Sequence, residues 1–228
     1  MLGVDGCPGY WVAAEVSAGA ARGHRTVRWH LLPVDPAELL ALPAVAVAID
    51  VPIGLPAAGS RPCDDAARVL LGAARASVFH TPSRPVLAAA DYIAACTLAR
   101  SRGERAPSKQ LWGIQPRIRA VDRGLQAAAP ADRERVLECH PELSFRALAG
   151  TPHLARKRTA PGVGQRIAAL APFVDAAVAL ADAPVQARVD DALDALACAW
   201  TASRWHAGTA RSLGGEPDER GLPMRIVS

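Results

Sequence analysis

Strand-like apolar runs alternate with turn formers at the start of the chain. Residues 2–5 and 11–16 are rich in β-forming side chains, and the sequence GCPG at residues 6–9 separates them at hairpin spacing. A third strand-like run covers residues 26–32, after a predicted turn at residues 20–25. The pattern therefore predicts an antiparallel meander of three strands.

A helix signal and a fourth strand follow. Asp35 suits the N-cap position and Pro36 the first helical position, so we predict a short helix that ends at residue 42. The apolar run at residues 44–50 then predicts a strand, and a helical crossover would place it parallel to the first strand. The predicted order up to residue 50 is β, β, β, α, β.

The remaining pattern is mainly helical. Residues 60–130 are rich in Ala, Arg and Pro and lack the alternation of a strand, which predicts a mainly helical insertion. We also predict a fifth strand at 135–139, helices at 142–148, 163–180 and 189–206, and an edge strand in the tail. Together these elements indicate a single α/β domain over residues 1–228, with a mixed five-stranded sheet flanked by helices and the insertion at about 60–130.

Composition fits one domain with an insertion. The chain has 228 residues, of which 50% are hydrophobic and 21% charged, so it can bury a substantial core. The formal net charge of +4 suits a polyanionic partner but lacks the dense basic runs of nucleic-acid-binding tails. Charge alone therefore decides little about function.

Cysteine usage and hydropathy bear on the compartment. The five cysteines have no C-x-x-C spacing, so neither a disulfide framework nor a thiolate zinc site is indicated. The chain enters a strand pattern at once, which leaves no room for a signal peptide. The most lipid-like stretch, residues 167–185, is interrupted by Pro172, Asp175 and Asp182. We expect a cytoplasmic protein with no membrane partner, and its oligomeric state stays open.

Four acids lie where the chain is otherwise most apolar. Asp5 and Asp50 end apolar strands, and Asp191 and Asp194 lie in the helix-like DDALDALACAW. A bare carboxylate in such surroundings costs several kcal/mol unless its charge is compensated. Asp5 and Asp50 are expected at the carboxyl ends of parallel strands, and the spacing of three puts the other two on one helical face, with Asp190 as a substitute at a spacing of four. We expect these carboxylates to converge.

An oxygen-only cluster favours hard cations, so Mg²⁺ or Mn²⁺ is indicated rather than Zn²⁺. Two such ions about 3.5–4 Å apart serve phosphodiester displacement in many enzymes. Hydrolysis of nucleic acid follows as a hypothesis. The alternative is that Asp5 and Asp50 are turn residues and that Asp190 or Asp191 only caps the last helix.

Several strings of the chain carry a resemblance over almost its whole length: GVDGCPGYWVAA, AIDVPIGLP, RPCDDAARVLLGAARASVFHTPSR, SKQLWGIQPRIRAVD, ECHPELSFRALAG and DDALDALACAW. In this order they resemble a bacterial and archaeal family of predicted RNase H-like nucleases, domain-of-unknown-function family 429. The β-β-β-α-β opening and DDALDALA are also similar to the Holliday-junction resolvase branch of the RNase H-like superfamily.

This resemblance implies an RNase H-like fold and a set of metal ligands. Asp5 matches the first-strand acid, Asp50 the fourth-strand acid, and Asp191 with Asp194 the acids of the final helix. Resolvases usually have a glutamate where this chain has Asp50, whose reach is shorter. Glu138 ends the fifth strand and is a further candidate ligand or base, or else a carboxylate paired with an arginine.

Other functions remain open at this stage. The glycines of the first loop follow G-x-x-G-x-x-G, which is not the dinucleotide fingerprint. Arg156, Lys157 and Arg158 are either phosphate contacts or a solvated charge run. The leading hypothesis is a metal-dependent nuclease or phosphodiesterase acting on DNA or RNA. The alternatives are a non-catalytic module that binds nucleic acid or protein and, lower in rank, a nucleotide-handling phosphotransferase.

Overall fold

The computed structural model describes residues 1–18 and 25–228, so most of the turn predicted at residues 20–25 lies outside the described residues. The chain divides into two compact units. The first comprises Met1–Asp50, Glu134–Arg211 and Val227–Ser228, and the second comprises Val51–Arg133 and Ser212–Ile226. No helix in the described residues has both the length and the apolar character needed to cross a bilayer.

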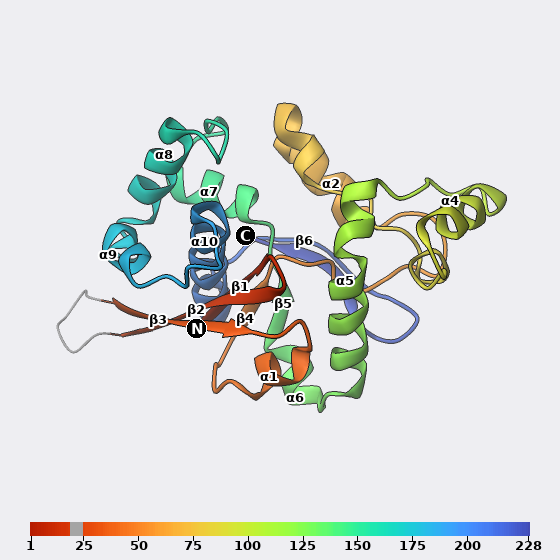
Figure 1. Ribbon diagram of the computed structural model, residues 1–228, viewed down its shortest axis with the longest axis horizontal. Helices are drawn as coiled ribbons and strands as arrows, with labels where there is room; N and C mark the ends of the chain where they lie inside the picture. The colour runs from red at the N-terminus through yellow and green to blue at the C-terminus, as the bar shows by residue number, and fades with distance from the viewer. Residues whose placement is uncertain (19–24) are drawn as a thin grey trace. The chain divides into compact units, whose positions relative to one another are not determined.

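The first unit is built on a five-stranded mixed sheet in the order β3-β2-β1-β4-β5 (Figure 1). β1 pairs antiparallel with β2, and β2 with β3, whereas β1, β4 and β5 are parallel. The predicted meander and the parallel fourth strand are thereby confirmed. The strands are β1 (Leu2–Cys7), β2 (Tyr10–Ala18), β3 (Arg25–Leu32), β4 (Val47–Ile49) and β5 (Val136–Glu138).

The short helix α1 (Pro36–Ala41) forms the crossover into β4. The carboxylate of Asp35 accepts a hydrogen bond of 2.9 Å from the backbone N–H of Ala37, which satisfies a donor that the first turn leaves unpaired. The predicted cap is therefore confirmed. In the same unit the guanidinium of Arg135 donates to the carbonyls of Leu42 and Ala44, which fixes the end of the crossover against β5.

Helix α10 (Val189–His206) packs on one face of this sheet. A Cβ atom on Gly3 would lie 2.0 Å from the carbonyl oxygen of Ala195 and 2.0 Å from the backbone nitrogen of Ala199. Only glycine allows so close an approach of helix and strand. Figure 1 shows α10 beside β1 and β2, with α7 (Pro141–Ala149), α8 (Ala160–Leu170) and α9 (Ala176–Ala181) around it.

The predicted helix over residues 163–180 is wrong in one respect, because the structure has two helices there. α8 ends at Leu170 and α9 begins at Ala176. Pro172 has no backbone N–H to donate, and its ring clashes with the carbonyl four residues earlier, so a regular helix cannot continue through it. Asp175 then caps α9 by accepting from the backbone N–H of Val178 at 3.1 Å.

The second unit contains the segment predicted to be a helical insertion, and residues 60–130 contain no strand. Arg61 and Asp64 form a buried ion pair of 2.6 Å at the start of α2, and Arg61 also donates to the carbonyl of Ile53. The single-domain organisation stays a prediction. The elements are α2 (Pro62–Leu71), a 3₁₀ helix (Gly72–Ser77), α3 (Arg84–Leu87), α4 (Tyr92–Ser101), α5 (Lys109–Ala127) and α6 (Pro130–Glu134).

The tail does not extend the main sheet as a full edge strand. β7 (Pro223–Val227) pairs with β6 (Ser212–Pro217) in a separate two-stranded sheet. One isolated parallel bridge, between Val227 and Cys139, joins the end of the tail to the strand β5 region. β6 was not predicted, because its segment SLGGEP has two glycines and no alternation of apolar residues.

Candidate functional site

Parallel pairing brings Asp5 and Asp50 to the same edge of the sheet. Val4 is in register with Ile49, and the backbone N–H of Asp50 donates to the carbonyl of Val4 at 3.0 Å. Each acid follows one of these two paired residues, so they occupy neighbouring positions at the carboxyl ends of β1 and β4. Asp5 is buried and Asp50 is half-buried. The backbone N–H of Gly6 donates to Oδ1 of Asp5 at 2.7 Å.

The last helix contributes three buried acids. Asp190, Asp191 and Asp194 lie in the first two turns of α10 and are 2%, 8% and 3% exposed. The helix dipole favours acids in the first turn, which applies to Asp190 and Asp191. Asp194 lies one turn further along, next to Ala195, whose carbonyl oxygen approaches Gly3 of β1.

The acids of the sheet and the helix influence one another's protonation. Burial raises the pKa of Asp5 well above its usual value, and the charges of Asp50, Asp194 and Asp191 raise it further. Burial also raises the pKa of Asp194 to about 7, with a contribution from Asp50. The pKa of Asp50 is raised by burial, against the charges of His140 and Lys157. These acids therefore form one electrostatically coupled cluster.

A lysine supplies positive charge to this cluster. The ammonium of Lys157 lies 2.5 Å from Oδ2 of Asp194 and 3.7 Å from Oδ2 of Asp190. Although burial opposes it, the charges of Asp194, Asp5 and Asp50 raise the pKa of Lys157. Lys157 therefore stays protonated at neutral pH and is part of the site, rather than of a solvated basic run.

Asp190 and Asp191 differ from Asp194 in their partners. Arg158 donates to Oδ2 of Asp190 at 2.8 Å. Burial alone would raise the pKa of Asp190, but this hydrogen bond and the charge of Lys157 hold it below its usual value. Oδ2 of Asp191 accepts from the backbone N–H of Arg188 at 3.2 Å; Arg188 is the N-cap residue of α10, and Asp191 supports it from the third helical position instead of being the cap itself.

Glu138 is buried, but its side chain faces away from α10. Glu138 is in register with Ile49 of β4. One residue earlier on each of the three parallel strands, Gly3, Ala48 and Leu137 are in register with one another. Gly3 faces α10, and side chains alternate between the two faces of a strand. The register and the alternation therefore assign Glu138 to the face opposite α10.

Sequence reasoning placed Lys157 among possible phosphate contacts and missed its contact with Asp194. The one available signal was composition: Lys157 and Lys109 are the lysines of a chain with 26 basic residues. A lysine in an arginine-rich chain fits a position that needs the compact charge of an ammonium group rather than the planar guanidinium of arginine.

The acid cluster has the right donor atoms for a divalent cation, but its side chains are not arranged around a metal position. All of its acidic groups are oxygen donors, which hard cations prefer. Within residues 1–18 and 25–228, however, no group of three or more His, Cys, Asp or Glu side chains has an arrangement that could hold a metal ion. The Lys157 ammonium lies among the acids instead. A cation bound by Asp5, Asp50, Asp191 and Asp194 would therefore require these side chains to move together.

These features define a mixed α/β protein with coupled acids at the carboxyl edge of its parallel strands. A family model described as "Protein of unknown function (DUF429)" matches residues 3–219, and the chain belongs to that family. Searches of curated proteins and of solved structures found no match.

Proposed function

We propose that the chain is a metal-dependent nuclease or phosphodiesterase with an RNase H-like fold. The observation that carries this proposal is the coupling of Asp5, Asp50 and Asp194, whose pKa values are all raised and which share the Lys157 ammonium. Perturbed pKa values tend to cluster at functional sites, because catalytic acids and bases need pKa values matched to their task.

The strand order supports the fold assignment. Three antiparallel strands followed by two parallel ones, with α10 on the sheet, agree with the arrangement expected from the resemblance to RNase H-like proteins. Ligands of such sheets gather beyond the carboxyl ends of the parallel strands, which is where Asp5 and Asp50 lie.

The proposed metal ligands are Asp5, Asp50, Asp191 and Asp194, and the ion is Mg²⁺ or Mn²⁺. When bound, such an ion lowers the pKa of a coordinated water and stabilises charge on a phosphoryl oxygen. The ammonium of Lys157 would then be released from Asp194 and could bind a phosphate oxygen of the substrate, because it is protonated and 41% exposed. Glu138 is left out of this set because its side chain faces the other side of the sheet.

Cleavage of a panel of single-stranded, branched and RNA–DNA hybrid substrates with Mn²⁺ tests the proposal. Asp5→Asn and Asp194→Asn should each lower the rate by at least about a hundredfold, because each removes a charge on which the ion depends. Glu38→Gln removes an exposed acid of α1 and is the matched control. Cleavage that survives Asp5→Asn undiminished would refute the site.

A second candidate is a non-catalytic binding module on the same fold. Its supporting observation is that Lys157 already compensates Asp194 and Asp190, so the cluster has a counter-ion of its own. Calorimetric titration with millimolar Mn²⁺ separates the two candidates. Binding that Asp5→Asn and Asp194→Asn abolish favours the enzyme, and absence of binding to the wild-type protein favours the module.

A further inference from the structure

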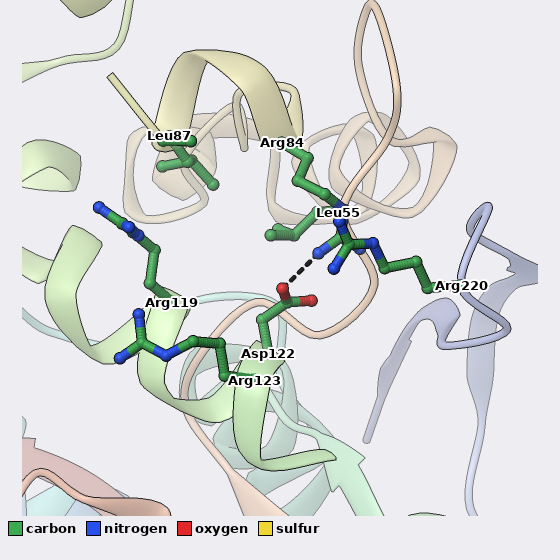
Figure 2. Close-up of a pocket in the computed structure, with 8 residues that line it drawn as sticks. Leu55, Arg84, Leu87, Arg119, Asp122, Arg123 and Arg220 are labelled. Carbon is green, nitrogen blue, oxygen red and sulfur yellow. Dashed lines mark hydrogen bonds and ion pairs between the residues drawn. The ribbon is translucent and has the colours of Figure 1, made fainter. Parts of the chain in front are cut away.

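The second unit contains a pocket of about 160 Å³ that combines an apolar floor with a rim of arginines (Figure 2). Leu55 and Leu87 form part of the floor. The basic residues that line it come from three segments far apart in the sequence: Arg84 from α3, Arg119 and Arg123 from α5, and Arg220 from the loop between β6 and β7.

Arg84 is the structural anchor of this pocket. Its guanidinium pairs with Asp122, the acid of the lining, and with Oδ2 of the buried Asp218 at 2.6 Å. Asp218 also accepts from the backbone N–H groups of Leu55 and Leu222, at 2.9 and 3.0 Å. The charge of Arg84 is therefore compensated, and the network holds the floor and the β6–β7 loop in place.

The other arginines of the rim are not compensated in this way. Arg119 and Arg123 are four residues apart on α5, and neither has a hydrogen bond or ion pair within the described residues. Like charges at this spacing repel each other along a helix. Arg220 donates to Oε1 of Gln126 at 2.5 Å, and the nearby carboxylate on which its charge acts, Asp122, already pairs with Arg84.

We propose that this pocket binds the phosphate group of a ligand. A tetrahedral phosphate offers more acceptor oxygens, pointing in more directions, than a carboxylate or a halide, and so suits several planar guanidinium forks at once. Bound at the rim, it relieves the repulsion between Arg119 and Arg123. The apolar floor accommodates the part of the ligand next to the phosphate, such as a sugar or a base. The nuclease proposal is not needed for this site, whose residues are separate from the acid cluster.

Calorimetry with three probes tests the site: inorganic phosphate, adenosine 5′-monophosphate and a single-stranded twelve-nucleotide DNA without terminal phosphates. At constant ionic strength set with sodium chloride, at least one phosphate-bearing probe should bind. Arg119→Gln combined with Arg123→Gln should weaken that binding by roughly tenfold or more, because each substitution removes a charge-assisted hydrogen bond. Preference for the mononucleotide identifies a small ligand, and preference for the DNA identifies a nucleic-acid backbone.

Arg100→Gln is the matched control, because it removes the same charge from an exposed position on α4 that does not line the pocket. It should leave binding unchanged. Thermal unfolding of each variant shows whether it folds, and the three probes can be compared on the wild-type protein alone. The proposal is overturned if none of the probes binds the wild-type protein, or if binding is the same in the double variant as in the wild type.

Discussion

The ammonium of Lys157 lies 2.5 Å from Oδ2 of Asp194, and this contact joins the loop before α8 to the second turn of α10. It places a protein cation among acids that lie at the ends of β1 and β4. The raised pKa values follow from this arrangement: the single positive charge of Lys157 lowers the pKa of several acids, but burial outweighs it at Asp50 and Asp194 and, together with the neighbouring carboxylates, at Asp5.

Lys157→Met should destabilise the protein at pH 8, because Asp194 then stays buried without its counter-ion. We expect a loss of about 1–2 kcal/mol, less than for a fully buried pair because Lys157 is 41% exposed. Urea unfolding with and without Mn²⁺ measures it. If the acids bind metal, Mn²⁺ should stabilise this variant more than the wild type. Lys109→Met removes an exposed lysine and should change neither quantity.

Stability without metal should fall as the pH rises from 4 to 7. The folded pKa of Asp194, about 7, lies above its unfolded value of about 3.9, so the folded state binds more protons in this window. The stabilisation that comes from protonated Asp194 is fully present below pH 4 and is lost as the pH rises through 7. Asp5 and Asp50 act in the same direction because burial raises both pKa values.

Urea unfolding in the presence of a chelator, at steps between pH 4 and 8, measures this slope. Asp194→Asn should flatten it by about 1–3 kcal/mol across the window, since an amide does not titrate. Glu38→Gln should leave the slope as it is in the wild type. An unchanged slope in Asp194→Asn would mean that this acid does not titrate in the window.

Gly3→Ala should be strongly destabilising, by about 3 kcal/mol or more, because the new Cβ would meet backbone atoms of α10 at 2.0 Å. Backbone atoms cannot turn aside as a side chain can, so α10 must shift from β1. Gly113→Ala is the control: it lies in helix α5 with open space around it, and should stabilise by roughly 0.5–1 kcal/mol. Chemical denaturation of both variants gives the comparison.

The second unit depends on the buried pair of Arg61 and Asp64. Arg61→Met should cost about 3–5 kcal/mol, because it leaves the Asp64 carboxylate buried without its partner, and both side chains are at most 2% exposed. Adding Asp64→Leu should recover part of this loss. A double-mutant cycle by urea unfolding measures the coupling, and additive losses would contradict it.

Local pattern was sufficient for most elements of the first unit. β1, β2 and α10 were predicted because each has the periodicity of its element over several residues, and α1 because Asp35 and Pro36 are strong starting signals. The single helix predicted at 163–180 was wrong, because the prediction followed the apolar content of this segment and did not place a break at Pro172. In the structure α8 ends at Leu170, two residues before Pro172.

The sequence by itself determined which acids end apolar strands and open the last helix, because these are local properties of the chain. It did not determine which groups meet. The contact of Lys157 with Asp194, the face of the sheet that Glu138 occupies and the arginine rim on α5 depend on long-range packing. These long-range contacts depend on which backbone segments pack together, as β1 and α10 do at Gly3 and Ala195. Packing of this kind leaves no periodic signal in the sequence.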